Sequence, residues 1–345
     1  VYYMSPKALE NPSSLDAATC GTGPFQLSEF ENNAYAIYTK NENYWKEGLP
    51  YLDSVEVTLV TESSTANTAF QANEYDMYWV GLANPTILQQ LDGAGIYVKE
   101  DNQNGMGVES LGLIPNSAID GPWADARVRR ALCYAIDVDA INAAFLMGMA
   151  QMTDQWAVPG SATYNDSLNH FTYDPEKAKS LLAEAGYADG LEITVMLNED
   201  RDFINVVEIA QNMWKEVGIT TNIEIMDQAT LLSKAAEGTV SMGVTNSTPT
   251  TGDPDHALMI WPTTYDSFLR NNNTKIDEYL AAGKAAYDET ERAAIYKEAM
   301  EYMWQQYNLI PICFTNAIYG TGADVENFEC HPGNTPNLAK VTFAS

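Results

Sequence analysis

Basic residues are scarce in this sequence. Its 345 residues include 18 lysines and arginines and 3 histidines against 47 aspartates and glutamates, for a formal net charge of −29. A surplus of this size repels other polyanions, with a screening length of about 10 Å at physiological salt. It therefore argues against nucleic acid or an anionic membrane face as a partner.

Long apolar segments are missing too. No run approaches the roughly 20 apolar residues that cross a bilayer. The first residues, VYYMSPKALE, have neither the basic nor the apolar region of a signal peptide. We expect either that a signal was removed or that the chain begins partway through a gene product.

Cysteines are few, and none forms a CxxC pair. Four cysteines are too few for a disulfide scaffold. Cys133 lies in an apolar helical pattern, which predicts a buried thiol. Cys313 and Cys330 flank a predicted strand-turn-strand segment, which is compatible with a disulfide between them or with two thiols. Cys20 is left unassigned.

Catalytic motifs are absent as well. The glycines of GTGP (21–24) are not followed by GK[ST], so they predict a tight turn rather than a phosphate-binding loop. The motifs GxSxG and HExxH do not occur, nor does a glycine-rich dinucleotide turn after a strand. A carboxylate pair for glycoside hydrolysis is recognised only by its spacing in the fold. We expect no enzyme and no cofactor, with a secreted hydrolase as an alternative.

One acidic segment, GDPDHAL, suggests a metal site through Asp253, Asp255 and His256. A calcium loop that starts at Asp253 needs glycine at its sixth position and glutamate at its twelfth, where Leu258 and Thr264 stand. The segment instead predicts a turn in which Asp-Pro starts a helix. No metal site is expected.

What the sequence does contain is a clear alternation of strand and helix. Apolar residues make up 46%, enough for a packed core, and the length favours two lobes. Between 191 and 245, the strands LEITVML, ITTNIEIM and VSMGVT are separated by two helical segments. This βαβαβ order predicts a parallel sheet with right-handed crossovers. Further strands are predicted at 34–40, 54–60, 75–80 and 310–320, and further helices at 65–74, 174–186, 274–289 and 291–307, with another starting near Asp125.

Three of the scarce cations lie together in DARVRRALCYAID (125–137). An anion site is one interpretation. At helical spacing, Asp125 and Arg129 are four residues apart, which predicts an ion pair, while Arg127 and Arg130 share another face. Because acids are abundant enough to serve as partners, we interpret the arginines as scaffold.

Six segments, in order over nearly the whole chain, form a recognisable set. They are GTGPFQL (21–27), NENYWKEGLPYLDSVEV (41–57), PWADARVRRALCYAID (122–137), YDPEKAKSLLAEAGY (173–187), GDPDHAL (252–258) and DETERAAIYKEAMEYMWQQYNLIPI (288–312). This set resembles the extracytoplasmic solute-binding proteins of ABC importers, family 5 (the oligopeptide-, dipeptide- and nickel-binding type). In that family a long further segment normally precedes the first match, so the resemblance implies a C-terminal fragment in which lobe I is incomplete.

The resemblance implies a two-lobed α/β fold of the periplasmic-binding-protein type. Lobe I would comprise 1–108 and 310–345, and lobe II 109–309, with hinge crossings near 109–116 and 309–312 that let the lobes close on a solute. The implied function is capture of a small solute, a peptide by family default, outside the membrane and its delivery to an ABC permease. The protein would be a monomer, lipid-anchored at full length. A ligand-binding lobe of a signalling receptor is a second alternative.

Candidate solute contacts lie beyond a strand end and on two tryptophans. Ligands of open α/β sheets bind beyond the carboxyl ends of parallel strands, where the loop TNSTPTTG (245–252) follows VSMGVT; an ordinary polar connection is the alternative. Peptide-binding members of the family usually carry a tryptophan and, three residues later, an aspartate that holds the peptide's α-ammonium group; Ser247 and Thr250 stand there. This departure favours neutral polar solutes such as sugars, or peptides bound differently. The candidates are Asn246, Ser247, Thr248, Thr250, Thr251, Trp79 near a strand end and Trp156 in the loop TDQWAVPG.

Overall fold

Two compact units make up the described part of the chain. Unit 1 takes its residues from Val1–Gly81, Thr86–Glu100 and Ile318–Ser345, and unit 2 from Asp101–Ala317. The computed structural model describes residues 21–80, 87, 89–91, 97–99, 108–145, 148, 151–152, 155, 157, 163–168, 172–198, 203–247, 255, 273–307, 310–316, 318–331 and 335–344.

Unit 2 is built on a six-stranded mixed sheet in the order β7-β11-β6-β10-β8-β9. The predicted βαβαβ order is confirmed, since β8 pairs in parallel with both β9 and β10. On the other side, β6 pairs antiparallel with β10 and with β11. The strands are β6 Val108–Pro115, β7 Gln151–Met152, β8 Leu191–Asn198, β9 Ile219–Met226, β10 Met242–Ser247 and β11 Ile310–Asn316.

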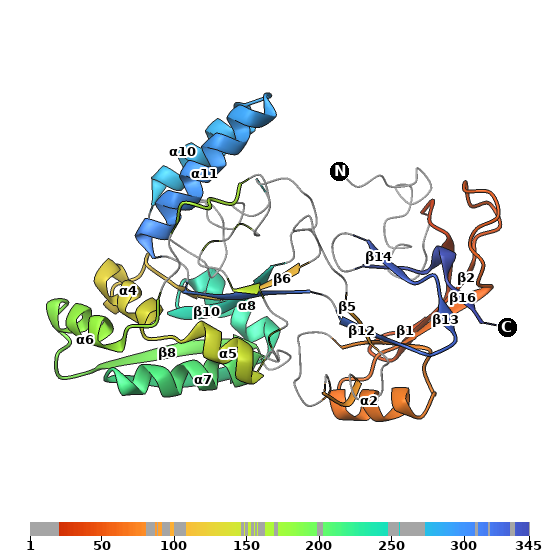
Figure 1. Ribbon diagram of the computed structural model, residues 1–345, viewed down its shortest axis with the longest axis horizontal. Coiled ribbons are helices and arrows are strands. Elements are labelled where there is room, and N and C mark those ends of the chain that lie inside the picture. The colour runs from red at the N-terminus through yellow and green to blue at the C-terminus, as the bar shows by residue number, and fades with distance from the viewer. Residues whose placement is uncertain are drawn as a thin grey trace. The chain divides into compact units, whose positions relative to one another are not determined.

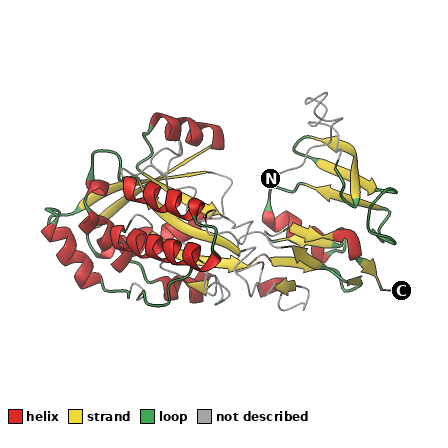
Figure 2. Cartoon of the chain, turned by 90° about the horizontal axis from the view of Figure 1, so that it is seen from above, coloured by secondary structure: helices red, strands yellow, loops and turns green. Residues whose placement is uncertain are grey.

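Helices cover this sheet on both faces, because β8 is apolar on both. Met196 packs against Leu231 and Ala235 of one helix, while Val195 and Leu197 point to the opposite face and are also buried. Trp214 is fully buried and donates from Nε1 to the carbonyl of Leu132, 3.2 Å away. Figures 1 and 2 show the helices against the sheet; they are α4 Ala126–Tyr134, α5 Val138–Phe145, α6 Pro175–Glu184, α7 Phe203–Glu216, α8 Gln228–Glu237, α10 Thr274–Ala285 and α11 Glu289–Gln306.

The chain's course departs from the predicted one at the strand expected over 310–320. The segment 310–320 is not one strand: β11 lies in the sheet of unit 2, and β12 Ile318–Thr321 lies in a separate sheet of unit 1. Because β6 pairs along its whole length with β10 and β11, the unit boundaries fall at 100/101 and 317/318. The predicted boundaries at 108/109 and 309/310 fall inside unit 2.

Among its described residues, unit 1 contains small antiparallel sheets and the helix α2. Phe70 of α2 packs on Tyr78 and lies against Gly320, where any side chain would meet its ring. The sheets are β1-β2-β3, β4-β12-β5, β13-β16 and β14-β15. The elements are β1 Phe25–Glu31, β2 Tyr35–Lys40, β3 Ser54–Thr58, α2 Ser63–Gln71, β4 Met77–Trp79, β5 Tyr97–Lys99, β13 Val325–Glu326, β14 Glu329–His331, β15 Thr335–Asn337 and β16 Thr342–Phe343.

The β1-β2-β3 sheet has one apolar face. Phe30, Ala36 and Val57 are neighbours across the three strands, whereas Glu29, Ile37 and Glu56 occupy the other face. Phe30 and Val57 are 49% and 51% exposed, and no residue of β3 is buried. This sheet therefore contributes much less burial than the sheet of unit 2.

Hydrogen exchange should reflect this difference. We expect backbone amides of β8 and β9 to exchange much more slowly than those of β2 and β3, because local opening of a poorly buried sheet costs less free energy. Exchange followed by mass spectrometry on the chain measures both sheets at once. Equal and strong protection of the two would contradict the expectation.

Candidate functional site

The candidate loop begins later than the sequence predicts. The strand expected at 240–245 extends to Ser247, because β6 continues to pair with it: Asn246 lies opposite Leu111, and Ser247 opposite Ser110. Asn246 and Ser247 are therefore the last strand residues of β10 rather than loop residues. Thr248, Thr250 and Thr251 lie outside the described residues, as does Trp156.

Three strands of unit 2 end at the same edge of the sheet. β8 and β10 are parallel, and β10 and β11 are both antiparallel to β6, so Asn198, Ser247 and Asn316 are the final residues of strands that run in one direction. Asn198 is only 7% exposed, and sequence reasoning missed it. The available signal was a polar residue that closes an apolar strand, at the edge where α/β sheets bind ligands.

Trp79 is the one candidate side chain in unit 1. It ends β4 opposite Tyr319 of β12, and it is 58% exposed, whereas Tyr319 is buried. The side chains alternate along this short strand, with Tyr78 packed on the helix and Trp79 facing away. An indole held on a strand with more than half of its surface exposed is available to contact a ligand.

Asp255 follows the candidate segment and is held by the α10–α11 pair. The hydroxyl of Tyr296 donates to Oδ1 of Asp255 at 2.8 Å, and Nζ of Lys284 lies 3.8 Å from Oδ2. Burial raises the pKa of Tyr296 to about 12, with the guanidinium of Arg292 opposing the shift and the Asp255 hydrogen bond adding to it. The predicted structural role of this aspartate agrees with these contacts.

The arginines of α4 differ from one another. Asp125 caps the helix by accepting from the amide of Arg127 at 2.8 Å, and it also binds the Arg127 guanidinium, with Oδ2 2.6 Å from Nη2. Those hydrogen bonds, the side-chain bond first, lower the pKa of Asp125 against the effect of burial. The predicted Asp125–Arg129 ion pair is wrong, since Arg127 takes that place.

Arg129 instead binds backbone carbonyls. It is 5% exposed and donates to the carbonyl of Gln306 from Nε at 3.1 Å and from Nη2 at 2.8 Å. Its Nη1 donates to the carbonyls of Trp123 and Ala124. Gln306 ends α11, and helix C-terminal carbonyls favour a cation. Arg129 is thus a scaffold residue, as predicted, with partners that the sequence did not suggest.

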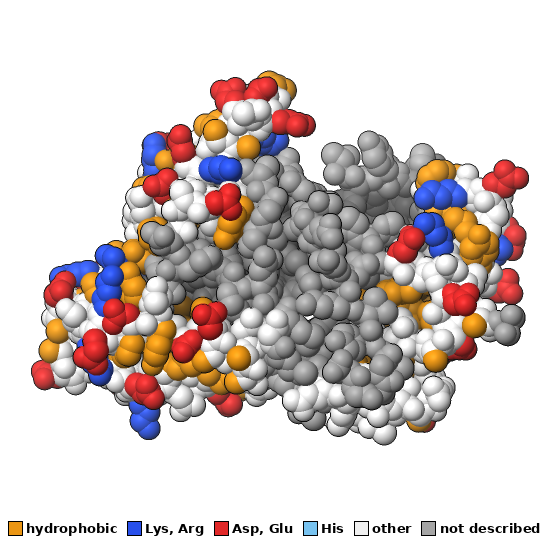
Figure 3. Space-filling view, viewed as in Figure 1, with side chains coloured by type: hydrophobic (Ala, Val, Ile, Leu, Met, Phe, Trp, Pro, Cys, Tyr) orange, Lys and Arg blue, Asp and Glu red, His pale blue; other side chains and the backbone are white. Residues whose placement is uncertain are grey.

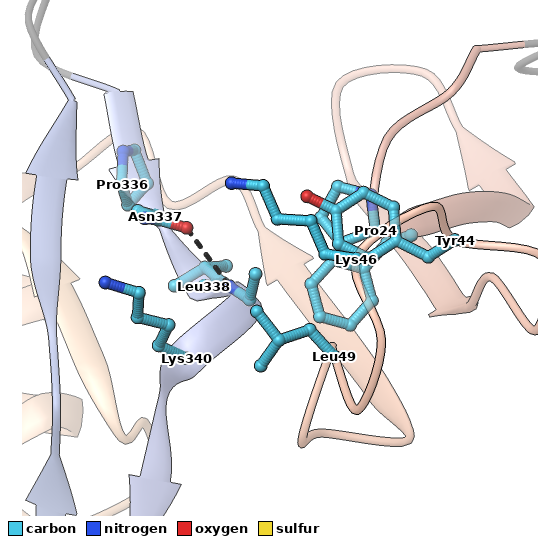
Figure 4. Close-up of a pocket in the computed structure, with 10 residues that line it drawn as sticks. Pro24, Tyr44, Lys46, Leu49, Pro336, Asn337, Leu338 and Lys340 are labelled. Atoms are coloured by element: carbon cyan, nitrogen blue, oxygen red, sulfur yellow. Dashed lines mark hydrogen bonds between the residues drawn. The ribbon is translucent and has the colours of Figure 1, made fainter.

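Unit 1 also contains a small cavity of about 220 Å³. Its walls include Pro24, Leu49 and Leu338, and Figure 4 shows the Lys46 side chain reaching from the Tyr44 side toward Pro336 and Asn337. The volume is below the roughly 300–1,000 Å³ typical of pockets that enclose small-molecule ligands. None of the predicted solute contacts lines it.

The described residues contain neither a metal-binding cluster nor a membrane-spanning helix. They hold no group of three or more His, Cys, Asp and Glu side chains arranged to bind a metal ion. Within the same residues, no helix has the length and apolar character needed to cross a membrane. Cys133 is a buried thiol, as predicted, whereas the side chains of Cys313 and Cys330, and all of Cys20, lie outside the described part.

The sequence matches the model of a known protein family. The model described as bacterial extracellular solute-binding proteins, family 5, middle part, matches residues 2–268, which is more than half of the chain. The chain belongs to this family. The predicted family is confirmed, and the match includes five of the six segments, with 288–312 lying beyond it.

Two curated relatives cover most of the family 5 chain. Heme-binding protein A of Haemophilus influenzae is 30% identical over 312 residues, which is 87% of this chain and 55% of the relative. Glutathione-binding protein GsiB of Salmonella paratyphi A is 28% identical over 344 residues, which is 95% of this chain and 65% of the relative. The chain thus spans between half and two thirds of the length of these proteins.

A solved structure confirms the predicted fold. The periplasmic binding protein DppA of Helicobacter pylori, solved with the peptide STSA, matches with a TM-score of 0.80 at 24% identity. The match covers 94% of this chain and 63% of DppA. The α/β fold of the periplasmic peptide-binding type is therefore the fold of this family 5 chain.

Proposed function

We propose that this chain is the larger part of a protein that captures a small solute outside the cytoplasmic membrane and delivers it to an ABC permease. Family membership supports this function, and so does the fold, which is shared with the peptide-binding DppA. The sequence offers no catalytic motif that would make the protein an enzyme. The protein works as a monomer and needs no cofactor, and its full-length form is lipid-anchored.

The solute is bound by a polar strand end and by two tryptophans, of which Trp79 is exposed. Ser247 supports this proposal most directly, because it closes β10 at the carboxyl edge of the parallel strands, where ligands of such sheets bind. The amide and hydroxyl groups beside it suit hydrogen bonds to a neutral polar solute, and Trp79 and Trp156 offer flat apolar surfaces. The hydrogen-bonding set is Asn246, Ser247, Thr248, Thr250 and Thr251.

A peptide with a free α-ammonium group fits this set less well. Thr250 stands where peptide-binding members usually place an aspartate, and a hydroxyl accepts a hydrogen bond without neutralising the charge. A neutral hydrogen bond contributes about 0.5–1.5 kcal/mol, against about 1.5–3 kcal/mol for one to a charged group. We therefore favour a neutral polar solute such as an oligosaccharide, or a peptide bound differently, over a peptide held by its α-ammonium group.

Calorimetry on the full-length protein tests the solute class. Di- to pentapeptides, glutathione, heme and oligosaccharides are titrated in parallel, and we expect the neutral solutes to bind most tightly. Introducing the missing carboxylate by Thr250→Asp should improve peptide affinity roughly ten-fold, while Thr250→Ser serves as the matched control. Tight binding of free-amine peptides that is lost on N-acetylation would contradict the proposal, because it requires another carboxylate in the site.

A further inference from the structure

Arg130 and Lys177 converge on one phenol group in unit 2. Nζ of Lys177 donates to the hydroxyl of Tyr134 at 2.9 Å and lies 4.2 Å from the centre of its ring. The guanidinium carbon of Arg130 lies 5.6 Å from the same ring centre and 5.3 Å from that of Tyr307. Two cations of different helices thus share Tyr134.

No carboxylate of the described residues forms an ion pair with either cation. Other cations of unit 2 have such partners: Arg127 binds Asp125, Lys179 binds Glu176, and Lys275 binds Glu278. The absence is unexpected in a chain with 47 acids and 18 cations, because two like charges at one oxygen repel each other. Among the described residues, this location therefore brings two cations together without a carboxylate partner.

Two further observations point to an anion at this location. Nε of Arg130 is buried and has no hydrogen-bond partner, which is costly for a guanidinium donor. Burial would raise the pKa of Tyr134, yet hydrogen bonds from Lys177 and Arg130 lower it, so the surroundings favour a negative charge. Figure 3 shows Lys and Arg side chains over α4 and α6, with Asp and Glu side chains among them.

We infer that Arg130, Lys177 and Tyr134 form a binding site for a small oxyanion, the phosphate or carboxylate group of a small molecule. Arg130 and Tyr134 come from α4, Lys177 from the first turn of α6, and Tyr307 follows the end of α11. A bound oxyanion beside the Tyr134 hydroxyl accepts from guanidinium and ammonium together, and so joins α4 to α6. A small ion fits better than an acidic protein surface, which the net charge of −29 repels as a whole.

Inorganic phosphate is the first probe. We expect the ³¹P NMR signal of phosphate to broaden saturably as protein is added. We also expect phosphate to raise the melting temperature of the protein relative to chloride at equal ionic strength. Arg130→Gln and Lys177→Gln should each weaken phosphate binding at least ten-fold. Lys275→Gln is the matched control, because Lys275 also lies over a tyrosine ring but is paired with Glu278, and it should leave binding unchanged.

Parallel titrations with acetate and succinate distinguish a phosphate from a carboxylate source. The site is supported if phosphate, acetate or succinate binds saturably and if this binding depends on both Arg130 and Lys177. The probe that binds most tightly then shows whether the ligand group is a phosphate or a carboxylate. A response that is the same in the wild type, Lys275→Gln and Lys177→Gln would overturn it. Since Lys177 is exposed, its variant remains folded and keeps the test decisive even if Arg130→Gln does not fold.

The oxyanion site does not depend on the proposed solute function. Arg130→Gln and Lys177→Gln should leave the affinity for the transported solute unchanged in calorimetry. If solute binding fails while phosphate binding behaves as expected, only the proposed function is overturned. If none of phosphate, acetate and succinate binds while the solute does, only the oxyanion site is overturned.

Discussion

Replacing Arg129 with alanine is expected to lower the free energy of unfolding by about 3 kcal/mol. The substitution removes donors to the carbonyls of Trp123, Ala124 and Gln306 and leaves a void at a position that is 5% exposed. Urea unfolding followed by circular dichroism measures the change. This loss of stability is larger than the loss expected from breaking the surface ion pair that the sequence predicted. It is larger because the backbone carbonyls that Arg129 binds lose their donor.

Arg127→Ala is the matched control for this experiment. Arg127 is two residues away in the same helix, and it is exposed and paired with Asp125. Exposed ion pairs contribute little to stability. Arg127→Ala should lower the free energy of unfolding much less than Arg129→Ala does. Neither variant should change solute affinity in the folded protein. Equal losses for the two variants would show that the carbonyl contacts of Arg129 do not hold η2 (Pro122–Ala124) and the end of α11 in place.

Replacing Gly283 with alanine should destabilise unit 2 by about 2 kcal/mol. A Cβ atom at this position in α10 would lie 2.6 Å from Oη and 2.8 Å from Cε1 of Tyr296, and closer still to Cζ. Tyr296 is fully buried and hydrogen-bonded to Asp255, so the ring has no space to move. Thermal and urea unfolding measure the loss.

The sign of the stability change on Gly283→Ala distinguishes a packed contact from an unobstructed position. Glycine in a helix interior is normally about 1 kcal/mol less favourable than alanine, so an unobstructed Gly→Ala change stabilises. In a Tyr296→Leu background, where the ring atoms are absent, Gly283→Ala should regain that stabilising sign. A stabilising Gly283→Ala change in the wild-type background would mean that α10 and α11 are not packed through this contact.

Local patterns predicted the βαβαβ core because each element carries its own signal. The strand β8 carries apolar residues at alternate positions from Leu191 and then continuously to Leu197, and α8 ends at Gly238, which takes the left-handed conformation that glycine favours. The division of 310–320 into β11 and β12 has only a weak signal, because just Thr315 and Asn316 interrupt the apolar run and the partners of both strands are distant along the chain. Pairing of that kind depends on the tertiary fold.

Site residues were harder to predict, since their roles depend on neighbours far along the chain. The partner of Arg129 is Gln306, 177 positions away, whereas helical spacing suggested a partner four residues away. Asn198 was missed because one polar residue after an apolar strand is common. Trp79 was found because its position near a strand end is visible in the sequence, and the fold leaves it exposed.

Mass spectrometry of ligand and protein together tests the central claim, that this chain binds a solute without changing it. Full-length protein purified from its native host is analysed under native conditions, and the released ligand is then incubated in excess with fresh protein. We predict one solute per protein molecule and full recovery of the added ligand with its mass unchanged. Conversion of the excess ligand to product would contradict the account, because it would make the protein an enzyme.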